Sequence, residues 1–105
     1  MSELNRMIHE PARLTVVALL SSVREADFLY LLRETGLTKG NLSTHLVRLE
    51  EAGYVEIEKT FRGKIPLTIV RLSTEGRAAF QAYRKSMKSI LQLSKARRVP
   101  GYAPT

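Results

Sequence analysis

Hydrophobic residues in the first half of the chain recur at helical spacing in three separate stretches. The first stretch begins at Pro11, a residue suited to the first turn of a helix, and ends near Ser21 or Ser22. The second covers residues 24–35, with an apolar stripe of Phe28 and Leu31, and ends at Gly36. The residues of the first helix expected to face the core are Leu14, Val17 and Ala18, with Leu19 or Leu20 beside them.

The third helical stretch follows after only Leu37, and so short a connection containing glycine is typical of a helix-turn-helix. Thr38 is a favourable N-cap, and Gly53 is placed to end the helix. The buried face is predicted from positions i, i+4 and i+7, which are Leu42, Leu46 and Leu49.

After Gly53 the pattern changes from helical to alternating, which indicates β-strands. Residues 54–61 and 67–72 read as two strands of a hairpin, joined by a short basic turn over residues 62–66. Pro66 lacks an N–H group, so we expect it at the beginning of its strand or on a free edge.

Ser73 is then placed to cap a long final helix, over about residues 74–93. Its apolar residues alternate at spacings of three and four, which is typical of a helix-packing seam about two heptads long. Packing within one chain and contact with a second copy both explain the seam; the length of the helix favours a dimer. The predicted dimer interface comprises Leu4, Ile8, Phe80, Tyr83, Met87, Ile90 and Leu91.

These elements predict a mainly α chain with a small β-hairpin, in the α+β class. Their order is that of a winged helix-turn-helix with a long C-terminal dimerisation helix. A chain of 105 residues is long enough for one domain. We therefore expect residues 1–95 to form that domain and residues 96–105 to be a flexible basic tail.

The amino-acid composition excludes several kinds of functional site. The chain contains no cysteine, which excludes disulfides, thiolate metal sites and cysteine catalysis. Its apolar run at residues 14–20 is shorter than the roughly 20 residues of a membrane span. The two histidines, His9 and His45, lie far apart in the sequence, and neither belongs to a nucleophile–base pattern. We expect a cytoplasmic protein that is not an enzyme, has no metal or cofactor, and does not bind membranes.

The net charge is +7, which favours a polyanionic partner. Residues 72–105 hold seven of the seventeen lysines and arginines and one of the ten acidic residues. This excess is explained either by a solvated helix face and tail or by long-range attraction to nucleic acid. The basic positions concerned are Arg77, Arg84, Lys85, Lys88, Lys95, Arg97 and Arg98.

The face of the third helix opposite its leucines is small and polar, as a helix entering a DNA groove requires. Asn41 can pair with adenine and Arg48 with guanine, whereas Gly40 has no side chain to keep the groove away. His45 lies beside the leucines, so packing is the preferred interpretation for it. The predicted DNA-binding residues of this helix are Thr38, Lys39, Gly40, Asn41, Ser43, Thr44 and Arg48.

The hairpin adds three basic residues near its tip, Lys59, Arg62 and Lys64. We interpret Arg62 as a minor-groove or phosphate contact and Lys64 as a phosphate contact; a solvated basic turn is the alternative.

The segments LTKGNLSTHLVRLEEAGYVEIEKTF, RGKIPLT and RLSTEGRAAFQAY closely resemble the small winged-helix DNA-binding regulators related to the MarR and ArsR groups. The resemblance covers roughly residues 11–84. It implies a dimer that places its third helix in the major groove and its wing beside the minor groove. It also implies that a small-molecule effector could bind between the first and last helices.

The leading hypothesis is therefore a transcriptional regulator, a repressor, that binds duplex DNA sequence-specifically as a homodimer on an inverted-repeat operator. The alternative is a winged-helix adaptor that binds protein or RNA, since one fold serves several functions.

Overall fold

The computed structural model describes residues 4–95 and residue 101. It contains four helices and a three-stranded antiparallel sheet, which confirms the predicted winged-helix α+β class. The predicted basic tail, including Arg97 and Arg98, lies outside the described residues apart from Gly101. The elements are α1 (Pro11–Ser21), β1 (Ala26–Asp27), α2 (Phe28–Thr35), α3 (Lys39–Glu51), β2 (Val55–Arg62), β3 (Ile65–Leu72) and α4 (Thr74–Gln92).

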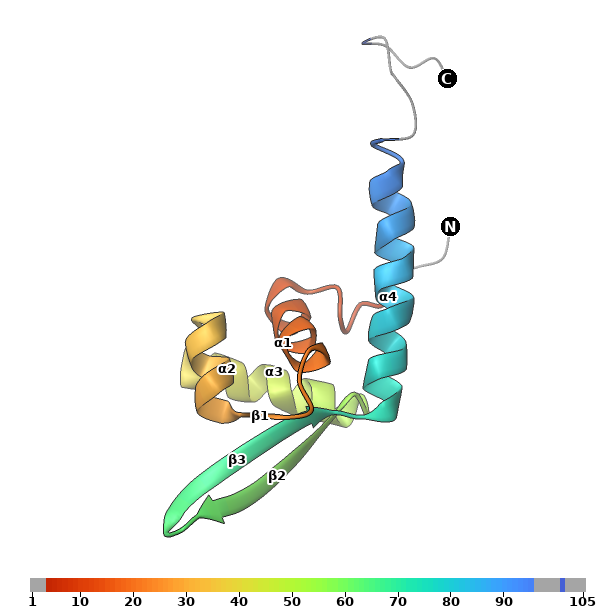
Figure 1. Cartoon of the computed structure of the whole chain (residues 1–105). Coiled ribbons are helices and arrows are strands. Elements are labelled where there is room, and N and C mark those ends of the chain that lie inside the picture. The colour runs from red at the N-terminus through yellow and green to blue at the C-terminus, as the bar shows by residue number, and fades with distance from the viewer. Residues whose placement is uncertain (1–3, 96–100, 102–105) are drawn as a thin grey trace.

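Helices α1, α2 and α3 form a compact group, from which two long elements extend in opposite directions (Figure 1). The β2–β3 hairpin leaves this group on one side, and the distal half of α4 rises beyond it on the other. One continuous hydrophobic core joins the helices to the base of the hairpin. Its buried side chains include Val16, Val17, Leu20, Leu31, Leu42, Leu46, Leu49, Val55, Val70 and Leu72.

Helix α1 begins where the sequence predicts, at Pro11. Glu10 is its N-cap, and the carboxylate accepts hydrogen bonds from the backbone N–H groups of Ala12 and Arg13. Val17 and Leu20 are buried as expected. Ala18 was expected in the core but is exposed, because the buried stripe of α1 is centred on Val16 and Val17.

The second helix begins later than expected. Residues 26–27 form strand β1 instead of helix, because Ala26 and Asp27 pair with Val70 and Ile69 of β3. The Asp27 carboxylate then caps α2 by accepting a hydrogen bond from the N–H of Tyr30. The helix ends at Gly36 as predicted, where φ is 70°.

The hairpin is longer and its turn tighter than predicted. Arg62 pairs directly with Ile65, so only Gly63 and Lys64 form the turn. Gly63 has φ of 63°, which suits the twist of a two-residue hairpin turn. Pro66 is the second residue of β3 and pairs with Phe61; β1 reaches only Val70 and Ile69, so the other edge of β3 is free at Pro66.

Three residues predicted for a dimer interface are used instead in the core of the chain itself. Ile8, Phe80 and Tyr83 are buried, and the Tyr83 hydroxyl lies 2.8 Å from Nδ1 of His9. The N-terminal segment thus covers the proximal half of α4, which satisfies this part of the helical seam within one chain.

Helix α4 starts against the end of α3. The Ser73 hydroxyl donates to the Gly53 carbonyl at 2.6 Å and accepts from the N–H of Gly76, while the Ser73 N–H donates to the Tyr54 carbonyl. Gly76 is buried directly beneath that Tyr54 carbonyl. We call Gly53, Tyr54, Ser73 and Gly76 the junction.

Replacing Gly76 with alanine should destabilise the fold, because the added Cβ would overlap the backbone carbonyl of Tyr54. We expect the free energy of unfolding to fall by about 1–3 kcal/mol, measured by urea denaturation. Gly40→Ala is the matched control: its Cβ would meet open space, so the free energy of unfolding should stay unchanged or rise by up to about 1 kcal/mol. Equal effects of the two variants would contradict the close approach at the junction.

Candidate nucleic-acid interface

Helix α3 buries one face and leaves the other bare. Leu42, Leu46 and Leu49 are buried as predicted, and Thr38 caps the helix by accepting a hydrogen bond from the N–H of Asn41. Every residue that the sequence assigned to DNA contact on this helix is exposed. These residues are Thr38, Lys39, Gly40, Asn41, Ser43, Thr44 and Arg48.

The exposed polar side chains of α3 are largely unengaged. Within residues 4–95, the side chains of Lys39, Asn41 and Arg48 form no hydrogen bond or ion pair. Thr44 differs, because its hydroxyl donates to the Gly40 carbonyl at 3.0 Å. That bond leaves the Thr44 methyl group and the oxygen lone pairs for a partner.

A shallow hollow lies along the outer face of α3. It is lined by Ser43, Thr44, Val47, Arg48 and Glu51. Val47 was not assigned a role from the sequence, although its helical position points away from the leucines; it is 49% exposed in the middle of this face. A valine there can contact the methyl group of thymine. Glu51 places negative charge at the C-terminal end of the hollow, which disfavours phosphate there.

A polar network fastens α3 to the start of α1. Nδ1 of His45 lies 3.2 Å from the Arg13 guanidinium and 3.5 Å from the Glu10 carboxylate. This contact agrees with the interpretation of His45 as a packing residue. Burial raises the pKa of the Glu10 carboxyl, but hydrogen bonds from the Ala12 and Arg13 N–H groups and the charges of His45 and Arg13 outweigh it, so the pKa lies below its usual value.

The hairpin presents its basic residues at the tip and keeps its acidic residues near the base. Lys59, Arg62 and Lys64 are exposed, and within residues 4–95 none of them forms an ion pair. At the base, Arg71 donates to Glu58 at 2.8 Å and to Glu25 at 3.1 Å. The hydrogen bonds to Glu58 and Glu25 raise the pKa of Arg71 above its ordinary value.

No role was predicted for Arg71, although its ion pairs link the base of the wing to neighbouring segments. Glu25 belongs to the segment before β1, so its ion pair ties the hairpin to the helical group. The pair with Glu58 also offsets negative charge on the strand that leads to the basic tip. No sequence signal placed these three residues together, because they lie in three separate segments.

The comparison with known families agrees with this geometry. Residues 12–91 match the family model described as a winged helix DNA-binding domain. This chain belongs to that family. It is a winged-helix DNA-binding protein of the transcriptional-regulator type.

Relatives of this winged-helix protein support the assignment. An uncharacterized protein of Methanocaldococcus jannaschii is 38% identical over 91 residues, which span 86% of this chain and 95% of that protein. A transcriptional regulator homologue from Pyrococcus horikoshii superposes with a TM-score of 0.79 at 27% identity, over 84% of this chain and 87% of that one.

A regulator of the MarR family from Enterococcus faecalis, described as putative, has a TM-score of 0.72 at 23% identity, over 88% of this chain and 84% of its own. At that identity the similarity shows the fold alone. The predicted resemblance to MarR-type winged helices is confirmed at this level.

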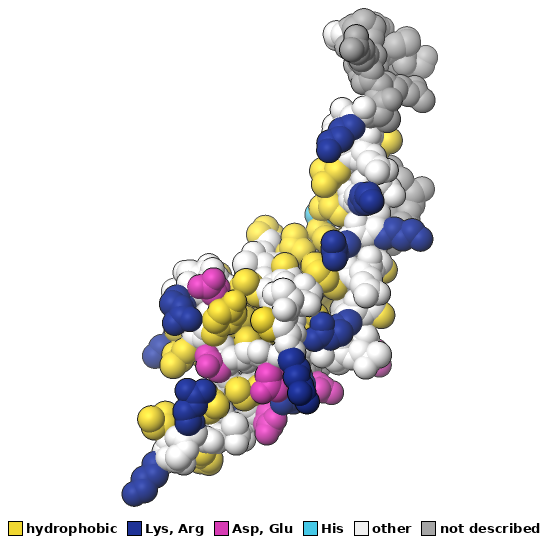
Figure 2. Space-filling view, in the orientation of Figure 1, with side chains coloured by type: hydrophobic (Ala, Val, Ile, Leu, Met, Phe, Trp, Pro, Cys, Tyr) yellow, Lys and Arg dark blue, Asp and Glu magenta, His cyan; other side chains and the backbone are white. Residues whose placement is uncertain are grey.

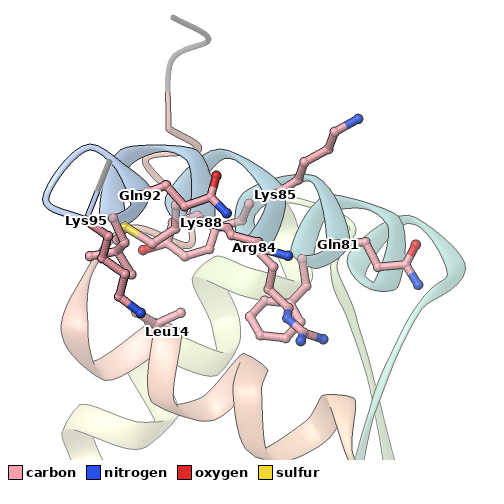
Figure 3. Close-up of a pocket in the computed structure, with 11 residues that line it drawn as sticks. Leu14, Gln81, Arg84, Lys85, Lys88, Gln92 and Lys95 are labelled. Carbon is pink, nitrogen blue, oxygen red and sulfur yellow. The ribbon is translucent and has the colours of Figure 1, made fainter. Parts of the chain in front are cut away.

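A second feature of the winged-helix chain is a hollow of about 710 Å³ between α1 and α4. Figure 2 shows hydrophobic side chains in the angle between the helical group and α4, with Lys and Arg side chains along the helix. Leu14 lines the hollow from α1, and Tyr83, Met87 and Leu91 line it from α4. In the close-up of Figure 3, Lys85 points away from α1.

The basic face predicted for α4 is only partly free. The Arg77 guanidinium donates to the backbone carbonyls of Ser21 and Val23, so it caps the end of α1 instead of facing solvent. Arg84 lies over the ring of Phe80, 6.0 Å from its centre. Lys85, Lys88 and Lys95 remain exposed along the helix and just past its end.

Over residues 4–95 and 101, the structure contains no group of three His, Asp or Glu that could hold a metal ion. None of the helices in the same part of the chain has the length and apolarity needed to cross a membrane.

Replacing Glu10 with alanine should weaken the attachment of α3 to α1. We expect the free energy of unfolding at pH 7 to fall by about 1 kcal/mol, the usual cost of losing an N-cap. Because the pKa of Glu10 is lowered by folding, its contribution is full above about pH 4.5 and is lost as the pH falls below that value.

The measurement is urea denaturation of wild type and variant at pH 7 and near pH 3. The difference between them should shrink at the lower pH. Glu50→Ala, on the exposed side of α3, is the control and should have little effect at either pH. A pH-independent difference for Glu10→Ala would argue against the charged cap.

Proposed function

We propose that this chain is a transcriptional repressor that binds an inverted-repeat operator in duplex DNA as a homodimer. The observation that carries the proposal is the pairing of two unengaged surfaces. One is the exposed face of α3, with Asn41 and Arg48, and the other is the basic tip of the hairpin. The first belongs to the helical group, and the second lies at the end of the hairpin that extends from the same core.

We assign the recognition of DNA bases to the first three turns of α3. Asn41 can bond bidentately to adenine and Arg48 to guanine, each worth about 1–3 kcal/mol against a wrong base. The N-terminus of the helix has partial positive charge, so Thr38 and Lys39 suit a phosphate. A Cβ at Gly40 would meet no other atom within 4 Å, which means that the surface there is open to a close DNA contact.

The wing is assigned to the DNA backbone. Lys59, Arg62 and Lys64 have no ion-pair partner among the described residues, so binding DNA breaks no internal salt bridge. Each phosphate contact releases counterions and adds a salt-dependent, sequence-independent part to the affinity. Arg62 is placed nearest the turn on its strand and suits a minor-groove or phosphate contact.

We assign the dimer interface to the distal half of α4. Beyond Tyr83, the seam continues through Met87, which is partly packed against the core, to Ile90 and then to Leu91, which is 59% exposed. Leu4 is partly buried at the side of the same helix and is kept in the proposed interface. A second copy offers a matching apolar helix, and two-fold symmetry places the half-sites about 34–36 Å apart.

The hollow between α1 and α4 is a second proposal, for a small apolar effector. The observation that favours it is the apolar part of the lining, formed by Leu14, Tyr83 and Met87, which suits an apolar molecule. The rest of the lining includes Arg84, Lys88 and Lys95. Because the same residues border the proposed dimer interface, a ligand there would act on the angle between α4 and the DNA-binding helices.

The DNA proposal is tested on a duplex that the wild-type protein recovers from a pool of genomic fragments. Arg48→Ala should weaken binding to that duplex about tenfold or more, and should have little effect on a scrambled duplex. Lys64→Ala should weaken both alike and reduce the slope of log affinity against log salt by about one. Fluorescence anisotropy titration gives these quantities.

The control is Arg6→Ala, on the N-terminal segment beside α4, which removes the same charge away from the proposed DNA-binding surface. This variant should change the affinity for either duplex little. Wild-type affinity that is indifferent to sequence would refute the proposal. If Arg48→Ala and Lys64→Ala bind DNA as wild type does but lose a protein or RNA partner, the chain is instead an adaptor.

The dimer proposal is tested with Leu91→Glu, which places charge in the distal seam without touching the core. We expect this variant to sediment as a monomer of 11.9 kDa with an unchanged circular dichroism spectrum, whereas the wild type sediments at twice that mass. Leu29→Glu is the matched control, since Leu29 is equally exposed but lies on α2. A monomeric wild type would contradict the interface.

A further inference from the structure

The tip of the hairpin carries more apolar surface than a phosphate contact requires. Phe61 is 67% exposed and Ile65 is 68% exposed, and Pro66 pairs directly with Phe61 across the strands. Figure 2 shows hydrophobic side chains beside basic ones at this end of the molecule. Covering an exposed phenylalanine removes apolar surface from water, so a partner that buries Phe61 would gain affinity.

The charges around this apolar surface indicate which partner it meets. Lys59 lies two residues before Phe61 on the same face of β2, and Arg62 and Lys64 follow it. The nearest acidic residue on the hairpin is Glu58, and its carboxylate is held by Arg71. A tip with three cations and no carboxylate is complementary to a polyanion. The apolar side chain of Phe61 suits a surface that lies between the phosphates of that polyanion.

The tip is also built to keep its shape. The two-residue turn pins the register of the strands, and the Arg71 ion pairs fix the base. Seven steps along β2 from Val55 to Arg62 reach roughly 24 Å at strand spacing. A wing of that length, starting at the end of α3, is long enough to contact the neighbouring groove when α3 lies in the major groove.

We infer that Phe61, backed by Pro66, acts as an apolar wedge in the minor groove and bends the operator. This inference rests on the proposed DNA-binding function. Phenylalanine and proline side chains form no hydrogen bonds to base edges, so they add specificity only through the DNA's shape. Wedges of this kind partly unstack a base step and kink the duplex, most easily at flexible pyrimidine–purine steps. The three cations hold the phosphates on either side.

The wedge predicts a preference at operator positions that α3 does not reach. Flexible steps such as TA or CA should recur where the wing contacts each half-site. Ile65 lies on the opposite face of the hairpin, paired with Arg62, where it adds contact with the groove wall.

The test uses the duplex recovered by wild-type protein, labelled at its ends with a donor and an acceptor fluorophore. Wild-type binding should raise energy transfer, as expected for a bend of at least about 20°. Phe61→Ala should lose most of that rise and bind about tenfold more weakly, with an unchanged salt slope. Phe61→Leu keeps an apolar wedge and should retain most of the bend.

Lys64→Ala is the matched contrast, because it should lower the salt slope and leave the bend intact. Phe61 is exposed, so Phe61→Ala should keep the wild-type melting temperature. Equal affinity and equal energy transfer for Phe61→Ala and wild type would overturn the wedge, while sequence discrimination by the wild type would still support the proposed function.

Loss of discrimination in the wild type itself would refute the proposed function first. If Phe61→Ala instead left DNA binding unchanged and abolished binding to anionic lipid vesicles or to another protein, the wing tip would have a different partner and the inference would be wrong.

Discussion

The close approach of Gly76 to the Tyr54 carbonyl is the constraint on which the rest of this structure depends. The end of α3, the base of the hairpin and the start of α4 meet at the four residues of the junction. The Ser73 hydroxyl links the Gly53 carbonyl to the first turn of α4, so neither element can rotate without breaking a hydrogen bond. This contact therefore helps to orient α3, the wing and α4, together with the attachment of α3 through Glu10 and His45 and of the wing through Arg71.

The parts of the fold predicted from sequence are those with local signals. Helix α3 has a cap, a leucine stripe and a terminating glycine within sixteen residues, so its bounds and its exposed face followed directly. The alternating pattern predicted both hairpin strands, but the turn was predicted over residues 62–66, whereas strand pairing continues as far as Arg62 and Ile65. Strand β1 has two residues and no periodicity of its own; it exists because β3 offers a free edge.

The candidate site was predictable where exposure depends on helical position, and not where it depends on distant partners. Asn41 and Arg48 are exposed because the leucines on the other face are buried. By contrast, the attachment of α3 through Glu10, Arg13 and His45 joins residues 32 or more positions apart, and no spacing rule reveals it. The same limit applies to the proximal part of the α4 seam: periodicity identifies an apolar stripe but not what covers it, and the N-terminal segment covers Tyr83 within the chain.

Rigid coupling at the junction has a consequence for regulation in the proposed dimer. Two copies joined by distal α4 hold their α3 helices at a separation set by the angle between α4 and the helical group. The contact at Gly76 holds the start of α4 against the base of the hairpin, and the hollow beside Leu14 and Met87 lies between α1 and the rest of α4. A ligand in the hollow that changed the angle of α4 slightly would change the separation of the two α3 helices by more. The two α3 helices would then no longer match half-sites about 34–36 Å apart. Affinity for the operator would then depend on the hollow without any contact between a ligand and DNA.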